Sequence, residues 1–306
     1  MRVTVIGAAN IDIIAKSKNK IVPGDSNPAD INLKAGGTAR DIAAMLAMRK
    51  IEVDLITAVG DDPFGNLLRE SCSGIGINTD AWIVKSNTST GVYLATLENN
   101  GELHAGFNAM TAPESIRTAE LAKHKKIIKD ADLLLMDLNL TEKILALSLE
   151  LRDNGPVLVD AVSIDKVQRI KNLLDRVDIL KLNRLEAETL TGMTLDTKER
   201  VRQASYNIVG RGVKRVFITL GVAGVCAADE NNAIFVPSIP IAVKGVKGVK
   251  GAGNAFTVGL AVSLESDIRA QAETGAKFSA EHLERNVIRD GLHNAHRETP
   301  TRRRSR

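Results

Sequence analysis

The chain has 306 residues, of which 44% are hydrophobic and 25% charged, proportions typical of a globular protein with a large core. No apolar run approaches the roughly 20 residues of a membrane-spanning helix, so we expect no membrane partner. The last ten residues hold five arginines and one glutamate, which alone accounts for the net charge of +4. This pattern favours a basic, disordered tail at 297–306, and with only 3% aromatic residues we expect no nucleic-acid partner.

The N-terminus passes directly into the strand-like Val3–Ile6, which indicates a cytoplasmic protein without a signal peptide. Cys72 and Cys226 lie far apart and in no metal-binding spacing, so we expect buried, reduced thiols. The five histidines are scattered, and their spacing indicates neither a zinc site nor a Ser-His-Asp triad.

Strand-like and helix-like segments alternate along most of the chain, which predicts an α/β fold whose mostly parallel sheet is covered by helices on both faces. The expected strands are Val3–Ile6, Asp54–Val59, Leu133–Met136, Val157–Asp160, Ile179–Lys181 and Val216–Thr219. The expected helices are Thr38–Arg49, Phe64–Cys72, Glu142–Asn154, Lys166–Leu174, Arg184–Leu190 and Thr197–Val209, with a last helical region, interrupted by breaks, from Gly253 to about Ala295.

Two stretches interrupt this alternation, near residues 11–35 and 82–108. The second contains three short strand-like runs, and Asn99-Asn100-Gly101 between the last two is a strong hairpin signal. A few short strands cannot bury both faces of the sheet that they form, so these stretches predict a small β lid that closes over a ligand. The alternative is an ordinary surface hairpin. The three runs are Trp82–Lys85, Val92–Glu98 and Leu103–Phe107.

The most informative stretch is Gly251-Ala252-Gly253-Asn254, followed by an apolar, helix-like run. Small residues opening a helix let backbone N–H groups approach an anion at the positive end of the helix dipole. Phosphate is one such anion. Alone, the pattern is more often a plain strand-to-helix turn.

Two further stretches place polar groups beside glycines. Asn10 and Asp12 follow the first strand, at the edge where open α/β sheets bind ligands, and a carboxylate there can accept hydrogen bonds from a sugar diol. Gly36 and Gly37 open an amphipathic helix that carries Asp41. The alternative is that Asp12 is a turn or cap residue and that the glycines only form a tight turn.

Six motifs in this order resemble the ribokinase-like (PfkB) carbohydrate kinase family over roughly residues 1 to 265. They are Gly-x-x-Asn-x-Asp at 7–12, Gly36-Gly37 with Asp41, the run 58–65, Asn183-Arg184-Leu185-Glu186, the run 219–225, and the turn 251–254. Within the family the likeness is greatest to the pseudouridine kinases, through 25–28, 108–110, 160–163 and 182–190. The resemblance implies a three-layer αβα ribokinase-like domain over 1–296 with lid segments near 11–35 and 82–108.

The resemblance also implies the site. A nucleoside or sugar would be bound by Asn10, Asp12, Gly36, Gly37, Asp41 and Asn108, and ATP, as co-substrate, by Asn183, Thr219, Gly221, Gly224 and Lys250. Mg²⁺ would be organised by Asn183 and Glu186, and Gly251, Ala252 and Gly253 would form the anion hole beside the catalytic position 254. A homodimer through paired lid strands is implied too.

Position 254 departs from the family, because the resemblance implies an aspartate there that takes the proton from the attacking hydroxyl. Asn254 can orient the hydroxyl but cannot deprotonate it, and losing a general base costs about 10²–10⁴-fold. Two hypotheses follow. The chain is a kinase with weak or absent activity, or it is a nucleoside- and nucleotide-binding protein without turnover.

Overall fold

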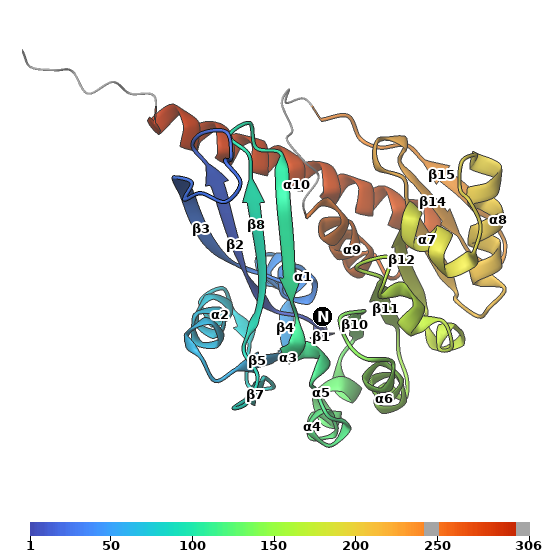
Figure 1. Cartoon of the computed structure of the whole chain (residues 1–306). Helices are drawn as coiled ribbons and strands as arrows, with labels where there is room; N and C mark the ends of the chain where they lie inside the picture. The colour runs from blue at the N-terminus through green and yellow to red at the C-terminus, as the bar shows by residue number, and fades with distance from the viewer. Residues whose placement is uncertain (242–250, 298–306) are drawn as a thin grey trace, which may run out of the picture.

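A nine-stranded sheet forms the centre of the computed structural model, which describes residues 1–241 and 251–297, with side chains through Arg285 (Figure 1). Every neighbouring pair from β13 to β6 is parallel, whereas β14 and β15 add antiparallel strands at one edge. In spatial order the strands are β15 (Ala233–Val236), β14 (Val225–Ala228), β13 (Arg215–Thr219), β12 (Ile179–Asn183), β11 (Val157–Asp160), β10 (Leu133–Asp137), β1 (Arg2–Ile6), β4 (Glu52–Ile56) and β6 (Ile77–Asn78).

Helices cover both faces of this sheet and form two separate cores. Alternate residues of one strand enter different cores: Leu134 and Met136 pack on one face, and Leu133 and Leu135 on the other. This arrangement confirms the expected three-layer αβα fold. The first face is covered by α4 (Thr118–Ala122), α5 (Lys125–Asp130), α6 (Glu142–Arg152), α7 (Arg184–Thr191) and α8 (Lys198–Val209), and the second by α1 (Thr38–Ala47), α2 (Pro63–Ser73), α9 (Ala252–Val262) and α10 (Ile268–Arg297).

A second, four-stranded sheet stands beside the main one (Figure 1) and is called the lid sheet below. Its strands, in spatial order, are β3 (Ala29–Gly36), β2 (Asn10–Ser17), β8 (Gly91–Leu97) and β9 (Leu103–Ala109). The hairpin expected at Asn99-Asn100-Gly101 joins β8 and β9, and Gly101 has a φ of +89°.

One strand predicted for the lid lies elsewhere. Ile83–Lys85 (β7) pairs with β5 (Ala58–Gly60) in a separate two-stranded sheet, so its assignment to the lid was wrong. The reason is packing, because Ile83 is 7% exposed and belongs to a core cluster that includes Ala58 and Ala81.

Other departures from the sequence-based prediction involve short elements. The helix expected at Lys166–Leu174 is replaced by two 3₁₀ turns, Val167–Ile170 and Leu174–Arg176. Arg169 donates to the carbonyl oxygens of Leu138 and Leu140, so contacts to a neighbouring loop set the path of this segment. The strand expected at Asp54–Val59 divides into β4 and β5. The helices α3 (Thr111–Glu114), α4 and α5 were missed, because four to six residues are too few to carry a helical periodicity.

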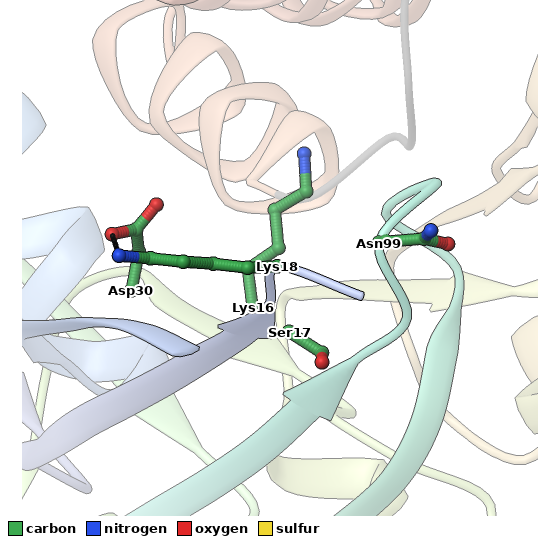
Figure 2. A pocket seen from close by; sticks show the side chains of 5 residues that line it. All are labelled: Lys16, Ser17, Lys18, Asp30 and Asn99. Carbon is green, nitrogen blue, oxygen red and sulfur yellow. Dashed lines mark ion pairs between the residues drawn. The ribbon is translucent and has the colours of Figure 1, made fainter. Parts of the chain in front are cut away.

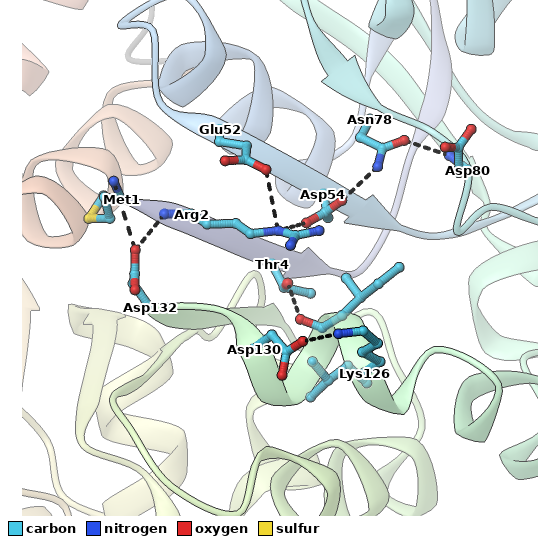
Figure 3. A network of polar contacts seen from close by, with 12 residues as sticks. Met1, Arg2, Thr4, Glu52, Asp54, Asn78, Asp80, Lys126, Asp130 and Asp132 are labelled. Atoms are coloured by element: carbon cyan, nitrogen blue, oxygen red, sulfur yellow. Dashed lines mark hydrogen bonds and ion pairs between the residues drawn. The ribbon is translucent and has the colours of Figure 1, made fainter.

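A network of charged and polar groups lies at the amino edge of the sheet (Figure 3). Arg2 Nε donates to Asp54 Oδ2 at 2.7 Å, and Asn78 Nδ2 donates to Asp54 Oδ1 at 2.8 Å. The backbone N–H of Arg2 donates to Asp132 at 2.7 Å. These contacts join β1, β4, β6 and the segment before β10. Within the described residues, no helix is long and apolar enough to cross a membrane.

Candidate active site

Two of the expected site residues lie at the carboxyl edge of the parallel strands. Asn183 ends β12 and pairs in register with Thr219, the last residue of β13. Asp160 ends the neighbouring β11, and Gly7 follows β1. Because parallel strands end at one edge, residues far apart in sequence meet there.

The lid sheet carries a polar row that contains two of the predicted substrate residues. Asp12 pairs with Lys34 and with Tyr93, and Tyr93 pairs with Asn108. Laterally paired residues share a face, so Asn108 lies on the face of Asp12, two strands and roughly 10 Å away. Asn10 Nδ2 donates to Asp12 Oδ1 at 2.9 Å, which orients the carboxylate.

Gly36 and Gly37 are needed because neighbouring groups approach their Cα atoms too closely for a side chain to fit. A Cβ on Gly36 would lie 2.6 Å from Asp12 Oδ1, so a side chain there would displace the carboxylate. Gly37 has a φ of +102°, and a Cβ on it would collide with the carbonyl oxygen of Ala8. The glycines therefore let the first turn of α1 approach both Asp12 and the turn after β1.

Asp41 lies in that first turn and pairs with Arg40 at 3.1 Å. Burial raises the pKa of Asp41, the Arg40 charge lowers it, and the nearby Asp12 charge raises it further. The Asp41 carboxylate therefore lies close enough to Asp12 to be affected by its charge.

Asp137, which the sequence analysis missed, connects these turns. One carboxylate oxygen, Oδ2, accepts the backbone N–H groups of Ala8 at 3.1 Å and Ala39 at 2.9 Å, and Oδ1 accepts that of Asn139 at 2.9 Å. A Cβ on Gly7 would occupy the position of this carboxylate. The available signal was an aspartate that ends the apolar run Leu133–Met136 at the carboxyl edge.

Asn183 and Glu186 form a capping box at the start of α7. Asn183 Oδ1 accepts the Glu186 N–H at 2.9 Å, and the Glu186 carboxylate accepts the Asn183 N–H at 2.7 Å. Glu186 is 1% exposed, and burial raises its pKa although the charge of Lys181 lowers it. A cation nearby would stabilise this buried carboxylate.

The described residues hold no group of three or more His, Cys, Asp or Glu side chains that could enclose a metal ion. Mg²⁺ retains several waters and is commonly bound through one or two carboxylates, so one buried glutamate beside a cap amide fits an indirectly held Mg²⁺. It does not fit a closed protein cage.

Thr219, which pairs in register with Asn183, and the nearby Gly221 and Gly224 are the other expected nucleotide residues that the structure describes. Thr219 Oγ1 donates to the carbonyl oxygen of Leu182 at 3.2 Å. Gly221 and Gly224 have φ values of +61° and +96°, and a Cβ on Gly224 would collide with the Val236 carbonyl oxygen. Lys250 lies outside the described residues.

The turn 251–254 opens α9 as predicted. Gly251 is the N-cap residue with a φ of +85°, and a Cβ on it would collide with the His282 ring of α10. Asn254 lies in the first turn of α9 and is half-buried. The first N–H groups of a helix have no partner within the helix, so those of this turn are the groups that the predicted anion hole would use.

Figure 2 shows a pocket of about 480 Å³ lined by Lys16, Ser17, Lys18, Asp30 and Asn99. It lies at the far end of the lid sheet, since Ser17 is seven residues along β2 from Asn10, roughly 23 Å at strand spacing. None of the predicted site residues lines it. This pocket is therefore not the candidate site.

Comparison with known proteins agrees with the motifs. The family model described as "pfkB family carbohydrate kinase" matches residues 1–286. A pseudouridine kinase of Escherichia coli (strain K12) is 35% identical over 259 residues, which are 85% of this chain and 82% of the relative. The structure of a carbohydrate kinase from Agrobacterium tumefaciens has a TM-score of 0.79 and 27% identity, covering 91% of this chain and 89% of its own.

The structure of Arabidopsis thaliana ribokinase complexed with ribose and ATP has a TM-score of 0.78 and 25% identity, covering 92% of this chain and 91% of its own. The expected likeness to ribokinases and to pseudouridine kinase is thereby confirmed. The chain belongs to the pfkB family of carbohydrate kinases and is a kinase of sugars or nucleosides.

Proposed function

We propose that the chain phosphorylates a primary hydroxyl of a nucleoside with ATP, and that pseudouridine is the first substrate to test. The observation that carries this proposal is the combination of Asp12, held by Asn10 and accommodated by Gly36, with the glycine turn that opens α9. A diol-binding carboxylate and an anion-binding turn are the two parts that transfer of phosphate to a sugar requires. The similarity to a pseudouridine kinase supports the choice of nucleoside.

In the proposed reaction, Asp12 and Asp41 accept hydrogen bonds from the sugar hydroxyls and fix the primary hydroxyl near Asn254. The hydroxyl oxygen forms a bond to the γ-phosphorus, the bond to the bridging oxygen breaks, and ADP leaves with that electron pair. The N–H groups of the 251–253 turn stabilise the phosphoryl charge. Because Asn254 cannot accept the proton, the proton passes to a phosphoryl oxygen and then to water.

Asn183 and Glu186 would hold Mg²⁺ through its waters, and bound Mg²⁺ would neutralise charge on the β- and γ-phosphates. Thr219, Gly221 and Gly224 would line the nucleotide beside them, with Lys250 near the phosphates. The lid sheet would close over the sugar and exclude water from the transfer.

A second copy of the chain is the partner we propose for the lid sheet. Leu33, Ile13, Leu94 and Phe107 form one row across its four strands, on the face opposite Asp12. Leu33 is 50% and Phe107 61% exposed, so the two ends of the row are apolar surface that dimerisation would cover, whereas Ile13 already packs partly against the second core. Sedimentation of a Phe107→Lys variant, which should shift a dimer toward monomer, tests this role.

Asn254 favours a second candidate function, in which the chain binds nucleoside and nucleotide but does not turn them over. An ADP-release assay with Mg²⁺-ATP over pseudouridine, uridine, ribose and fructose 6-phosphate separates the two. Slow release specific to one acceptor supports the kinase, and binding without release supports the second candidate. If a non-hydrolysable ATP analogue fails to bind in calorimetry, neither function stands.

A further inference from the structure

The run 58–65, one of the six motifs of the sequence, has no part in the proposed reaction. It contains β5 and the start of α2, and it lies beside the start of the lid strand β8 (Figure 1). None of its side chains is among the predicted site residues. Its contacts with the lid sheet should therefore indicate what the motif does.

Asp62 joins α2 to the residue that precedes β8. Its Oδ1 accepts the backbone N–H of Gly65 at 2.8 Å and so caps α2. The same oxygen accepts a hydrogen bond from the hydroxyl of Thr90 at 2.7 Å, and Oδ2 accepts the backbone N–H of Thr90 at 2.7 Å. An N-cap aspartate needs only the first of these contacts, so the other two serve the lid strand.

Thr90 is 3% exposed, and its hydroxyl is used twice. It donates to Asp62 and accepts the backbone N–H of Gly60 at 2.9 Å. A Cβ on Gly60 would lie 2.4 Å from Asp62 Oδ2, and one on Gly65 would lie 2.4 Å from the carbonyl oxygen of Gly60. The two glycines of the motif therefore allow Asp62 and Thr90 to meet.

The other central strand of the lid sheet begins at the same segment. Ala9, the residue before β2, donates its backbone N–H to Thr57 Oγ1 at 3.2 Å. Thr57 lies between β4 and β5 along the chain and is buried. The strands β2 and β8 run parallel, and their first residues, Asn10 and Gly91, pair in register. The segment 57–62 therefore fixes the starting points of both strands.

These starting points decide where the polar row of the lid sheet lies. Asp12 is two residues past the start of β2 and pairs in register with Tyr93 of β8. Tyr93 in turn pairs with Asn108 of β9. A shift of β8 at its start would move Asn108 relative to Asp12, and a misplacement of about 1 Å is enough to weaken a binding site.

We propose that Asp62 and Thr90 are positioning residues for the nucleoside. They hold the start of β8 in place, so that Asp12 and Asn108 bind the same sugar. This role rests on the proposed function, and neither residue touches the nucleoside itself. The expected nucleotide residues follow β12 and β13, and three strands separate β12 from β4 in the central sheet. Loss of the contact should therefore affect the nucleoside and spare the nucleotide.

The test removes one hydroxyl group and then restores it. Thr90→Val has nearly the size of threonine but loses both contacts of the hydroxyl, whereas Thr90→Ser keeps them. In calorimetry, the affinity for pseudouridine should fall about threefold to tenfold in Thr90→Val, as for loss of one hydrogen bond, and should stay within about twofold of the parent in Thr90→Ser. The affinity for a non-hydrolysable ATP analogue with Mg²⁺ should change less than about twofold in both variants.

Asp62→Asn tests the same contact from its other side. The amide nitrogen of asparagine would face a backbone N–H donor in either orientation, that of Thr90 or that of Gly65. The affinity for pseudouridine should therefore fall at least as far as in Thr90→Val, again without a matching loss for the ATP analogue. This variant keeps the proposal testable if Thr90→Val does not fold.

Thr197→Val is the matched control. Thr197 Oγ1 caps α8 by accepting the backbone N–H of Arg200 at 3.2 Å, and α8 packs against β13 and β14. This variant should lower the melting temperature and leave both affinities unchanged.

Three outcomes would overturn the positioning role. They are equal losses for pseudouridine and the ATP analogue, no loss for pseudouridine, or a loss in Thr90→Ser as large as in Thr90→Val. A parent chain that does not bind pseudouridine contradicts the proposed function instead, an outcome distinct from the other three because it needs no variant.

Discussion

The two edges of the central sheet use buried charges in different ways. At the amino edge, Asp54 is 1% exposed and is bonded by both Arg2 and Asn78 at 2.7 and 2.8 Å (Figure 3). Near the carboxyl edge, Asp12 of the lid sheet and Lys181 of β12 are about as deeply buried, but each lies against a glycine that leaves space beside its charge.

This difference separates structural charges from binding charges. A charged group that makes short hydrogen bonds to side chains of other strands holds those strands together. Its donors or acceptors are then occupied and cannot bind a ligand. A charge beside a glycine, with long or local contacts, can exchange them for contacts to a ligand. Burial alone does not distinguish the two classes, and each prediction below tests the distinction.

The largest effect is expected at Asn254. Asn254→Asp restores a carboxylate within reach of the attacking hydroxyl with little change in side-chain size, so kcat should rise about 10²–10⁴-fold while KM changes little. Steady-state ADP release with pseudouridine measures both constants. A variant that folds and binds ATP but remains silent on every sugar and nucleoside would eliminate the kinase hypothesis.

The next largest effect is expected at Asp12, in the predicted sugar-binding site. Asp12→Ala should weaken binding of the best nucleoside or sugar ligand by about 2–4 kcal/mol, because it removes a charged partner of buried polar groups. Calorimetry with that ligand gives the difference, and ATP-analogue affinity in the same variant serves as the control. Unchanged ligand affinity would return Asp12 to the role of a turn residue.

The amino edge should behave in the opposite way. Asp54→Asn removes the charge that joins Arg2 to β4, so the free energy of unfolding should fall by about 1–3 kcal/mol in urea denaturation. Nucleoside and nucleotide affinities should match the parent at a temperature where both chains are folded. A loss of ligand affinity without a loss of stability would contradict the division between the two edges.

Much of this architecture could be predicted from patterns in the sequence. The apolar runs that became β1, β10, β11, β12 and β13 are buried except at some strand ends, and glycines with polar neighbours identified the turns at 36–37 and 251–254. The placement of Ile83–Lys85 could not be predicted. A strand of three residues has too short a pattern to indicate its partner strand, and the packing of its side chains in the core decides the pairing.

The contacts of Asp137 and Lys181 depend on distant segments, which explains why local patterns missed them. Asp137 accepts N–H groups from Ala8 and Ala39, about a hundred residues away, and Lys181 approaches Gly253 across two elements. A lysine between leucines in a buried strand, as at Leu180-Lys181-Leu182, is nevertheless a signal that sequence reading can use.

The smallest effect concerns Asp41, where the pH dependence of binding distinguishes a ligand-binding carboxylate from a structural one. Burial raises the pKa of Asp41 in the folded chain, so its proton is taken up at a higher pH than that of an ordinary aspartate, and the stability that it contributes is lost as pH rises through that raised pKa. Binding that needs the ionised carboxylate has the opposite sign. We expect nucleoside affinity to weaken by a few-fold as pH falls through that raised pKa, with a smaller decline in Asp41→Asn.

Calorimetric titrations of both chains with pseudouridine across the pH range in which they stay folded measure this difference. Arg40, which pairs with Asp41 at 3.1 Å, offers a matched control. Arg40→Gln removes the charge that lowers the Asp41 pKa, so the loss of affinity should begin at a higher pH than in the parent. Identical pH profiles in all three chains would show that Asp41 does not contact the ligand as a carboxylate, and would place it with Asp54 among the structural charges.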